Sequence, residues 1–240
     1  MIIGILQTGK NHEELVDQYG TYAEMLVALI NSEEKIFEFK TFEILDEEFP
    51  KDHLECDGWI ITGSKHGVYE ELAWIKRLSK LINDIYDADK PLLGVCFGHQ
   101  IIAQALGGDV EKSKKGWGLG LHTYRIDNKT DYMGNLAEKI TLNICHQDQV
   151  ITPPKGAVVY AQSDFCNCAG FFIKDKVLTM QAHPEFLVDF TKDLLNFRSE
   201  DEGGYIPQEV VDKAIYGLED NPSRVESKHF AETIRRFFLN

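Results

Sequence analysis

"PLLGVCFGHQIIAQALGG", residues 91–108, joins an apolar run to a helical pattern through a glycine-flanked cysteine. The run at 91–95 is typical of a buried strand, and 99–108 predicts a short helix that its terminal glycines end. A buried strand that passes directly into a helix is the repeating unit of α/β folds. The stretch therefore predicts a parallel sheet and raises the question of what Cys96 does at the turn.

The N-terminal half repeats the same alternation. Apolar strand-like runs and amphipathic helical runs follow one another in the order β-α-β-β-α-β-α. The predicted strands are 2–6, 36–44, 58–62 and 91–95, and the predicted helices are 12–30, 68–88 and 99–108. This order predicts a central, mostly parallel sheet covered by helices.

The C-terminal half is richer in strands, which either extend the sheet or fold over one end of it. The predicted strands are 119–126, 157–163, 169–173 and 177–182. Helical patterns return in the tail at 187–240, and the polar, glycine-containing stretch at 199–209 predicts a surface loop. We expect one domain over residues 1–240.

Composition indicates an ordinary soluble globular protein. The chain has 240 residues, of which 43% are hydrophobic and 27% charged, with a formal net charge of −14. A negative surface repels a phosphate backbone, which argues against a nucleic-acid partner. The N-terminus lacks the basic start of a signal peptide, and no apolar run approaches the roughly 20 residues of a membrane helix, so no membrane contact is expected.

The cysteines indicate a reducing compartment rather than a disulfide framework. Five of them are scattered through a chain large enough to need no cross-links, which predicts a cytoplasmic protein. Cys166 and Cys168 lack the second ligand pair that zinc sites usually show, so we expect no metal. No cofactor is expected either.

Cys96 lies at the carboxyl end of a predicted parallel strand, where α/β enzymes collect their reactive groups. Gly94 and Gly98 leave room for the sharp turn of a nucleophile elbow. The following helix directs its free N–H groups at the sulfur, which favours the thiolate. Alone, the pattern fits a reactive cysteine and a buried structural thiol about equally. The helix is expected to turn the adjacent His99 aside.

"QAHPEF", residues 181–186, ends another apolar run. His183 and Glu185 lie two residues apart, so in an extended chain both side chains point to the same side. A neutral histidine accepts a thiol proton and returns it to a leaving group, while a carboxylate orients the imidazole. The alternative is a polar strand end. Together with the elbow, the motif favours a triad of Cys96, His183 and Glu185.

A third glycine-containing segment, "IITGSKHG" at 60–67, also follows a buried run. Its glycines let backbone N–H groups come close to a bound group. Acyl transfer through a tetrahedral intermediate needs two such donors. We predict that the N–H groups of Ser64 and Phe97 supply them, and the alternative is an ordinary glycine-rich turn between strand and helix.

Taken together, the motifs resemble those of the class I glutamine amidotransferases. "GVCFGHQ" is similar to the elbow of that family, "QAHPEF" to its Q-x-H-P-E motif, "IITGS" to its oxyanion loop and "CHQDQV" to its H-x-D-x-V stretch, all in family order within 58–186. The loop departs from the family, because "GSKHG" replaces the more usual "GGP" or "GPG". The resemblance implies a flavodoxin-like, three-layer α/β fold with a mostly parallel sheet, a β-rich extension and C-terminal helices.

The resemblance also implies hydrolysis of a γ-glutamyl amide through a thioester on Cys96. The substrate would be a small molecule, either glutamine or another γ-glutamyl compound. The substrate contacts that it implies are Gly63, Gln100, His146, Gln147 and Asp148. For Gln100 the alternative is a solvated amide in the first turn of a helix, and for His146 and Asp148 it is a polar loop.

Three hypotheses on function stay open. The helical tail resembles that of the stand-alone GMP synthase-like branch, which includes γ-glutamyl peptidases. About 55 residues follow Glu185, too few for a synthetase domain, so a glutaminase subunit would pass ammonia to a separate synthetase such as GMP synthase. The third hypothesis is a non-catalytic regulatory protein of the same fold.

Overall fold

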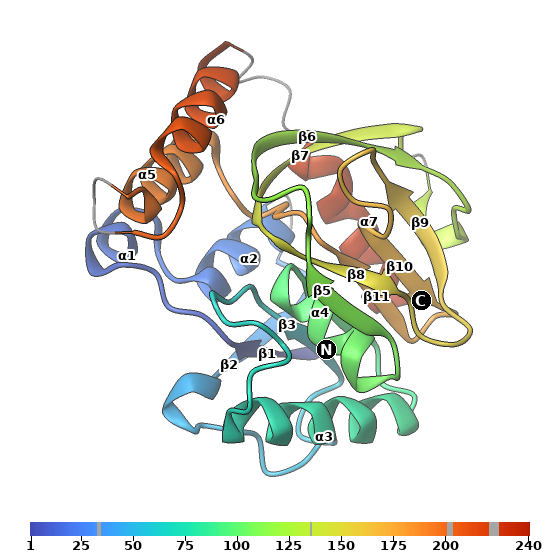
Figure 1. The fold of residues 1–240 in the computed structure, drawn as a ribbon. Helices are drawn as coiled ribbons and strands as arrows, with labels where there is room; N and C mark the ends of the chain where they lie inside the picture. Colours follow the sequence, from blue (N-terminus) through green and yellow to red (C-terminus); the bar gives the residue numbers. More distant parts are fainter. Residues whose placement is uncertain (33–34, 135, 201–203, 221–225) are drawn as a thin grey trace.

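A computed structural model describes the chain except residues 33–34, 135, 201–203 and 221–225. Its centre is a nine-stranded sheet in the order β2-β1-β3-β4-β11-β10-β9-β6-β7 (Figure 1). Strands β5 and β8 form a separate two-stranded ribbon. The predicted α/β architecture is confirmed. Among the described residues, no helix is long and apolar enough to cross a membrane.

Five neighbouring strands run parallel. They are β1 (Ile2–Gln7), β2 (Glu38–Glu43), β3 (Gly58–Ile61), β4 (Leu92–Val95) and β11 (Val177–Met180). Every residue of β3, β4 and β11 is buried, which explains their continuous apolar runs. Because parallel strands end at the same edge, the segments that follow these three strands meet there.

The other four strands extend the sheet with antiparallel pairing, so the first of the two alternatives for the C-terminal half is confirmed. They are β10 (Gly170–Ile173), β9 (Val158–Gln162), β6 (Gly118–Ile126) and β7 (Lys139–His146). The ribbon consists of β5 (Asp109–Lys112) and β8 (Asp148–Thr152). β7 is absent from the predicted strands, although Ile140, Leu142 and Ile144 alternate with the period of a strand.

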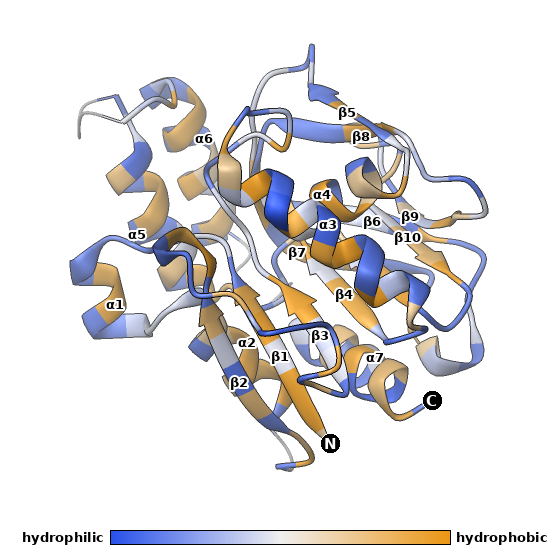
Figure 2. Cartoon of the chain, turned by 90° about the horizontal axis from the view of Figure 1, so that it is seen from below, coloured by the Kyte–Doolittle hydropathy of each residue, from blue (hydrophilic) through white to orange (hydrophobic). Residues whose placement is uncertain are grey.

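Helices cover both faces of the sheet (Figure 2). α3 (Ala73–Asp87) and α4 (Phe97–Ala105) pack on one face, and α2 (Tyr22–Ile30) and α7 (Ser227–Leu239) on the other. Consecutive residues of a strand point to opposite faces of the sheet. Ile60 accordingly packs in the apolar cluster with α2 and α7, and Ile61 in the cluster with α3 and α4.

The remaining helices are α1 (Glu13–Tyr19), α5 (Val188–Arg198) and α6 (Gln208–Asp220), which lie together beside the sheet (Figure 1). Short 3-10 turns lie at Ile44–Asp46 and Asp131–Met133. The prediction of one helix over 12–30 is wrong. The chain breaks at Gly20, whose φ of 84° ends α1, and Thr21 starts α2 with a capping box to Glu24.

The predicted surface loop at 199–209 is wrong at both of its ends. Ser199 and Ile206 are buried and pair through a β-bridge, and α6 already begins at Gln208. Part of the stretch, 201–203, lies outside the described residues. The bridge forms because Ile206 packs in an apolar cluster with residues of α5, α6 and β6. Burial of its side chain stabilises this segment despite the polar residues around it.

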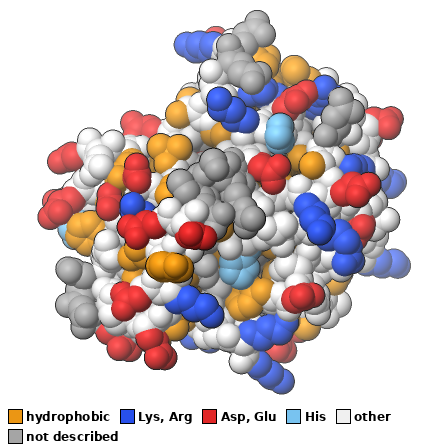
Figure 3. Space-filling view, turned by 90° about the horizontal axis from the view of Figure 1, so that it is seen from above, with side chains coloured by type: hydrophobic (Ala, Val, Ile, Leu, Met, Phe, Trp, Pro, Cys, Tyr) orange, Lys and Arg blue, Asp and Glu red, His pale blue; other side chains and the backbone are white. Residues whose placement is uncertain are grey.

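Charge is distributed unevenly over the surface. Figure 3 views the face at the top of Figure 1, where Asp and Glu side chains predominate on one half and Lys and Arg side chains on the other. The net charge of −14 therefore does not give this face a uniformly negative potential.

Candidate active site

Cys96 lies at the sharp turn between β4 and α4. Its φ of 53° and ψ of −104° are sterically strained for a residue with a side chain. The N–H of Cys96 donates to the carbonyl of Met180 at 2.9 Å, and that of Gly98 to Thr62 at 3.1 Å. A Cβ on Gly98 would lie 2.2 Å from the carbonyl oxygen of Ile61, so only glycine fits there. The predicted elbow geometry is confirmed.

His183 is brought beside Cys96 because β11 pairs with β4. The His183 N–H donates to the carbonyl of Asn143 on β7 at 2.8 Å. The imidazole stacks on Phe186, with ring centroids 3.8 Å apart and an interplanar angle of 8°. A Cβ on Gly63 would lie 2.9 Å from Cε1 of the same ring. Backbone, stacked ring and loop together hold the imidazole in one orientation.

Glu185 lies behind His183, with Oε1 2.7 Å from Nδ1 of the imidazole. Both side chains are buried. The two side chains meet and the strand ends before them as expected, but the chain between them is not extended, because β11 ends at Met180. A turn that the Phe186 N–H closes on the carbonyl of His183 at 3.3 Å brings the carboxylate to the ring instead.

The surroundings of His183 favour its protonated form. Burial alone lowers the pKa of the imidazole, but the sulfur of Cys96 and the carboxylate of Glu185 outweigh it and raise the pKa to about 10. A protonated imidazole beside a cysteine is an arrangement that promotes thiolate reactivity in proteins. The same proton is available to a leaving group.

Two backbone donors beside Cys96 have no acceptor among the described residues. In the described part of the chain, neither the N–H of Ser64 nor that of Phe97 donates a hydrogen bond. Phe97 is the first residue of α4, where helix N–H groups have no partner within the helix. The loop after β3 that contains Ser64 is held in place by the segment after β1, because the hydroxyl of Thr8 donates to the carbonyl of Thr62 at 3.0 Å.

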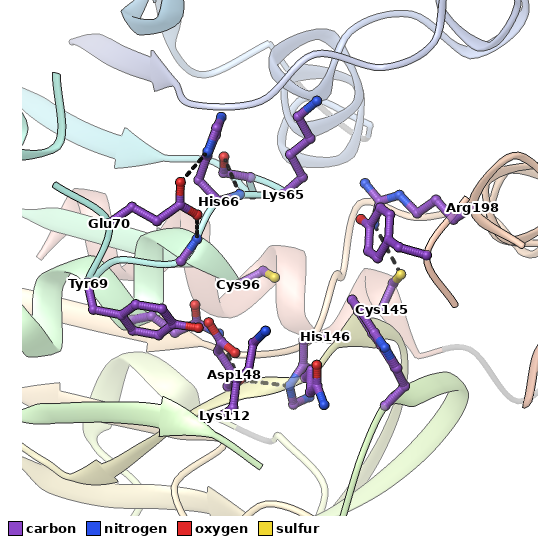
Figure 4. Close-up of a pocket in the computed structure, with 16 residues that line it drawn as sticks. Lys65, His66, Tyr69, Glu70, Cys96, Lys112, Cys145, His146, Asp148 and Arg198 are labelled. Atoms are coloured by element: carbon purple, nitrogen blue, oxygen red, sulfur yellow. Dashed lines mark hydrogen bonds and ion pairs between the residues drawn. The ribbon is translucent and has the colours of Figure 1, made fainter. Parts of the chain in front are cut away.

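A cleft of about 340 Å³ opens over Cys96 (Figure 4). This volume suits one small ligand. Of the substrate contacts that the family resemblance implies, Gln100, His146, Gln147 and Asp148 line the cleft, whereas Gly63 lines a smaller recess that adjoins Cys96. The further lining residues from the loop after β3 are Ser64, Lys65, His66, Gly67, Tyr69 and Glu70.

Gln100, His146 and Asp148 are tied to one another by hydrogen bonds. Gln100 Nε2 donates to the carbonyl of Asp148 at 2.9 Å and to Oε1 of Gln181 at 3.0 Å. Nδ1 of His146 lies 3.0 Å from the same Asp148 carbonyl. Burial lowers the pKa of His146 to about 3, so the ring is neutral at pH 7. Burial also raises the pKa of the Asp148 carboxyl, against the opposing effect of Tyr69.

His99 points into the core and is fully buried. Its Nδ1 lies 2.9 Å from the hydroxyl of Thr179, and its Nε2 lies 3.1 Å from the carbonyl of Cys168. Burial lowers the pKa of His99 to about 3. The prediction that the helix turns this histidine aside is confirmed.

Besides Phe186, three residues absent from the predicted site line the recess that adjoins Cys96. They are Tyr22, Cys145 and Arg198, from α2, β7 and α5. The guanidinium of Arg198 donates to the sulfur of Cys145 at 3.2 Å and to the hydroxyl of Tyr22 at 3.3 Å. Cys145 directly precedes the "HQDQV" stretch, a position that could have drawn attention to it. Tyr22 and Arg198 carry no such local signal.

All five cysteines are free thiols in buried positions. Burial raises the pKa of Cys166 and of Cys168 to about 12. In the ranges that the structure describes, no group of three or more His, Cys, Asp or Glu side chains could hold a metal ion. Cys166 and Cys168 each belong to one of the two large apolar clusters, so they pack as apolar side chains.

Comparisons with known proteins agree on one family. The sequence profile described as "Glutamine amidotransferase class-I" matches residues 14–197. The relative named gamma-glutamyl peptidase 4, from Arabidopsis thaliana, is 32% identical over 228 residues, which cover 92% of this chain and 88% of the relative. A GMP synthase (glutamine-hydrolyzing) of Crocosphaera subtropica is 29% identical over 172 residues, which cover 71% of this chain but 30% of the synthase.

The fold agrees as well. A solved structure of a glutamine amidotransferase from Thermotoga maritima superimposes with a TM-score of 0.77 and covers 99% of both chains. The two sequences are 19% identical. At this low identity the similarity concerns the arrangement of helices and strands.

Proposed function

Because the chain belongs to the class I glutamine amidotransferase family, we propose that it hydrolyses γ-glutamyl amide bonds. Cys96 is the nucleophile, His183 the general acid and base, and Glu185 the residue that orients His183. The observation that carries the proposal is the buried His183–Glu185 contact of 2.7 Å beside a cysteine on a strained turn. Strain of this kind persists where the surrounding structure enforces it, and it is frequent at active sites.

The reaction follows from these roles. The Cys96 thiolate attacks the γ-carbonyl carbon, and the carbonyl electron pair moves onto oxygen, where the N–H groups of Ser64 and Phe97 stabilise the charge. As the C–N bond breaks, His183 gives its proton to the leaving nitrogen, and a γ-glutamyl thioester remains. His183 then takes a proton from water, which attacks the thioester and releases glutamate and the Cys96 thiolate.

The glutamyl end of the substrate occupies the side of the cleft that Tyr69, Glu70 and Asp148 line. The carboxylates there offer acceptors for an α-ammonium group. The substrate contacts proposed for this end are Gln100, His146, Gln147 and Asp148, and Gly63 is proposed as a substrate contact in the adjoining recess. Since the amide nitrogen of Gln100 is already committed to Asp148 and Gln181, Gln100 acts mainly by fixing the segment that meets the ligand.

A γ-glutamyl peptide is the preferred substrate class. The observation that favours it is the match over 88% of a γ-glutamyl peptidase, compared with 30% of a GMP synthase. The second candidate is a glutaminase subunit that delivers ammonia to a separate synthetase. That candidate predicts slow turnover of glutamine alone and a large increase when the synthetase is added.

The test is turnover of glutamine and of γ-glutamyl dipeptides, followed as released glutamate and ammonia. Rapid quenching and intact-mass measurement should show one γ-glutamyl group on the protein. We expect Cys96→Ala to lower turnover by roughly 10,000-fold or more, because the nucleophile is lost. Cys56→Ala removes an equally buried thiol outside the cleft and should retain activity. If the wild-type protein turns over none of these compounds, the proposal is refuted.

A further inference from the structure

We propose that Arg198 binds a carboxylate on the group that leaves, so that the preferred substrates are γ-glutamyl peptides with a free C-terminal carboxylate. The inference rests on the proposed function, because it assigns a role within the same cleft. It distinguishes such peptides from glutamine, whose leaving group is ammonia and carries no carboxylate.

The position of Arg198 beside the nucleophile is the first support. It is the last residue of α5, and it lines both the cleft and the smaller recess that contains Cys96. Its carbonyl accepts the N–H groups of Tyr205 and Ile206, at 3.1 and 3.0 Å, so the end of the helix is fixed. A side chain on a fixed backbone loses little further freedom on binding a ligand.

The surroundings of the Arg198 charge in the described part of the chain are the second support. Its guanidinium donates to a thiol and a phenol, and among the described residues no Asp or Glu side chain forms an ion pair with it. On the same helix, Lys192 lies 3.7 Å from both Asp189 and Glu219. A partly buried cation without a counter-ion gains from a bound carboxylate, and the planar guanidinium matches that group with two parallel hydrogen bonds.

The side of the cleft on which Arg198 lies is the third support. The recess that Arg198 lines also contains His183, which protonates the leaving nitrogen in the proposed reaction. Figure 4 shows Arg198 and Cys145 on one side of the Cys96 sulfur and Tyr69 and Glu70 on the other. A substrate whose ammonium end lies near the carboxylates therefore directs its leaving group towards Arg198.

Two aromatic rings complete this side of the cleft. Trp117 and Tyr205 both line it, with ring centroids 5.5 Å apart. They offer an apolar surface to the side chain of the leaving residue, while Arg198 takes its carboxylate. Ammonia would leave both of these features unused.

The test compares matched acids and amides as substrates. γ-Glutamylalanine and γ-glutamylalanylglycine are each assayed against their C-terminal amides, with glutamine as a fifth compound. We expect wild type to prefer at least one acid over its amide. Arg198→Gln should lower kcat/KM for that acid by roughly 10- to 100-fold, mainly through KM, and leave the amide and glutamine within about threefold. Arg198→Lys should recover part of the loss, because it restores charge without the planar fork.

Lys192→Gln is the matched control, since it removes one positive charge from the same helix outside the cleft; it should leave the ratio of acid to amide unchanged. Equal loss on acid and amide would overturn the inference, because Arg198 would then act on the glutamyl end or on the fold. Absence of any acid preference in wild type would overturn it as well. If Arg198→Gln does not fold, Arg198→Lys decides by the same ratio. If the wild-type protein cleaves none of the five compounds, the proposed function itself is refuted.

Discussion

At the scale of single residues, the surroundings of His183 clearly change its protonation. Its pKa is raised from 6.5 to about 10 by Cys96 and Glu185, against the effect of burial. We expect the Cε1 resonance of His183 to titrate near pH 10 in an NMR experiment. Glu185→Gln removes one of the two favourable charges and should lower the midpoint. His99, whose pKa is about 3, should not titrate above pH 5 and serves as the control.

The same shift has a consequence for stability. Because the folded-state pKa is the higher one, the protonated ring stabilises the fold fully below about pH 6.5, and this contribution is lost as pH rises towards 10. Urea unfolding between these pH values should therefore show a stability loss that Glu185→Gln reduces. A midpoint for His183 that is unchanged by Glu185→Gln would contradict the account of both measurements.

The sequence could predict some residues of the site but not others. The glycine-flanked Cys96 and the motif with His183 and Glu185 each leave two interpretations open alone, and their combination predicts the triad, because each signal lies within a few consecutive residues. Arg198 could not be predicted in this way. A basic residue in the last turn of a helix usually complements the helix dipole, and only the packing of α5 brings this one to the cleft.

At the scale of elements, the contact between α4 and β3 depends on Gly98. A Cβ there would lie 2.2 Å from a backbone carbonyl oxygen, which cannot move without displacing the strand. We expect Gly98→Ala to destabilise the protein by about 1–3 kcal/mol or more, and to lower activity because Cys96 adjoins the displaced turn. Chemical denaturation and the rate of Cys96 alkylation measure the two effects.

Gly217 provides the control, since it also lies in a helix but a Cβ there meets no described residue within 4 Å. Gly217→Ala should stabilise α6 by about 0.5–1 kcal/mol through helix propensity. Similar effects of the two substitutions would show that close approach is not what requires glycine at residue 98.

Elements were predicted best where one local signal determined them. The strand-turn-helix at 91–108 is confirmed as β4 and α4, because apolar content and glycines agree there. The break at Gly20 was missed because the helical spacing of apolar residues continues across it. The turn that joins His183 to Glu185 was missed because a two-residue spacing does not distinguish a strand from a turn.

At the scale of the whole molecule, α7 supplies much of the core on one face of the sheet. Phe230 is fully buried there, and α7 contributes no residue to the cleft. We expect Phe230→Ala to destabilise the protein by about 3–5 kcal/mol while activity per folded molecule is retained. Tyr216→Ala, at a side chain that is 72% exposed, should change stability by less than about 0.5 kcal/mol. Loss of specific activity in folded Phe230→Ala would show that α7 also shapes the site.

The order of strands was only partly predictable. The parallel half follows from the alternation of strands and helices. The position of β11 does not, because it is the last strand in the sequence yet lies between β4 and β10 in the sheet. No local pattern in the sequence specifies which other strand a buried apolar strand pairs with.

The central position of β11 also determines when the protein can become functional during its synthesis. Strands β1 to β4 leave the ribosome first, and until residues 177–180 follow, one edge of β4 has no partner. An unpaired apolar edge is a template for wrong pairing, so this interval is when the nascent chain most needs a chaperone. Cys96 thus reaches its final backbone contact, with Met180, only after most of the chain has been translated.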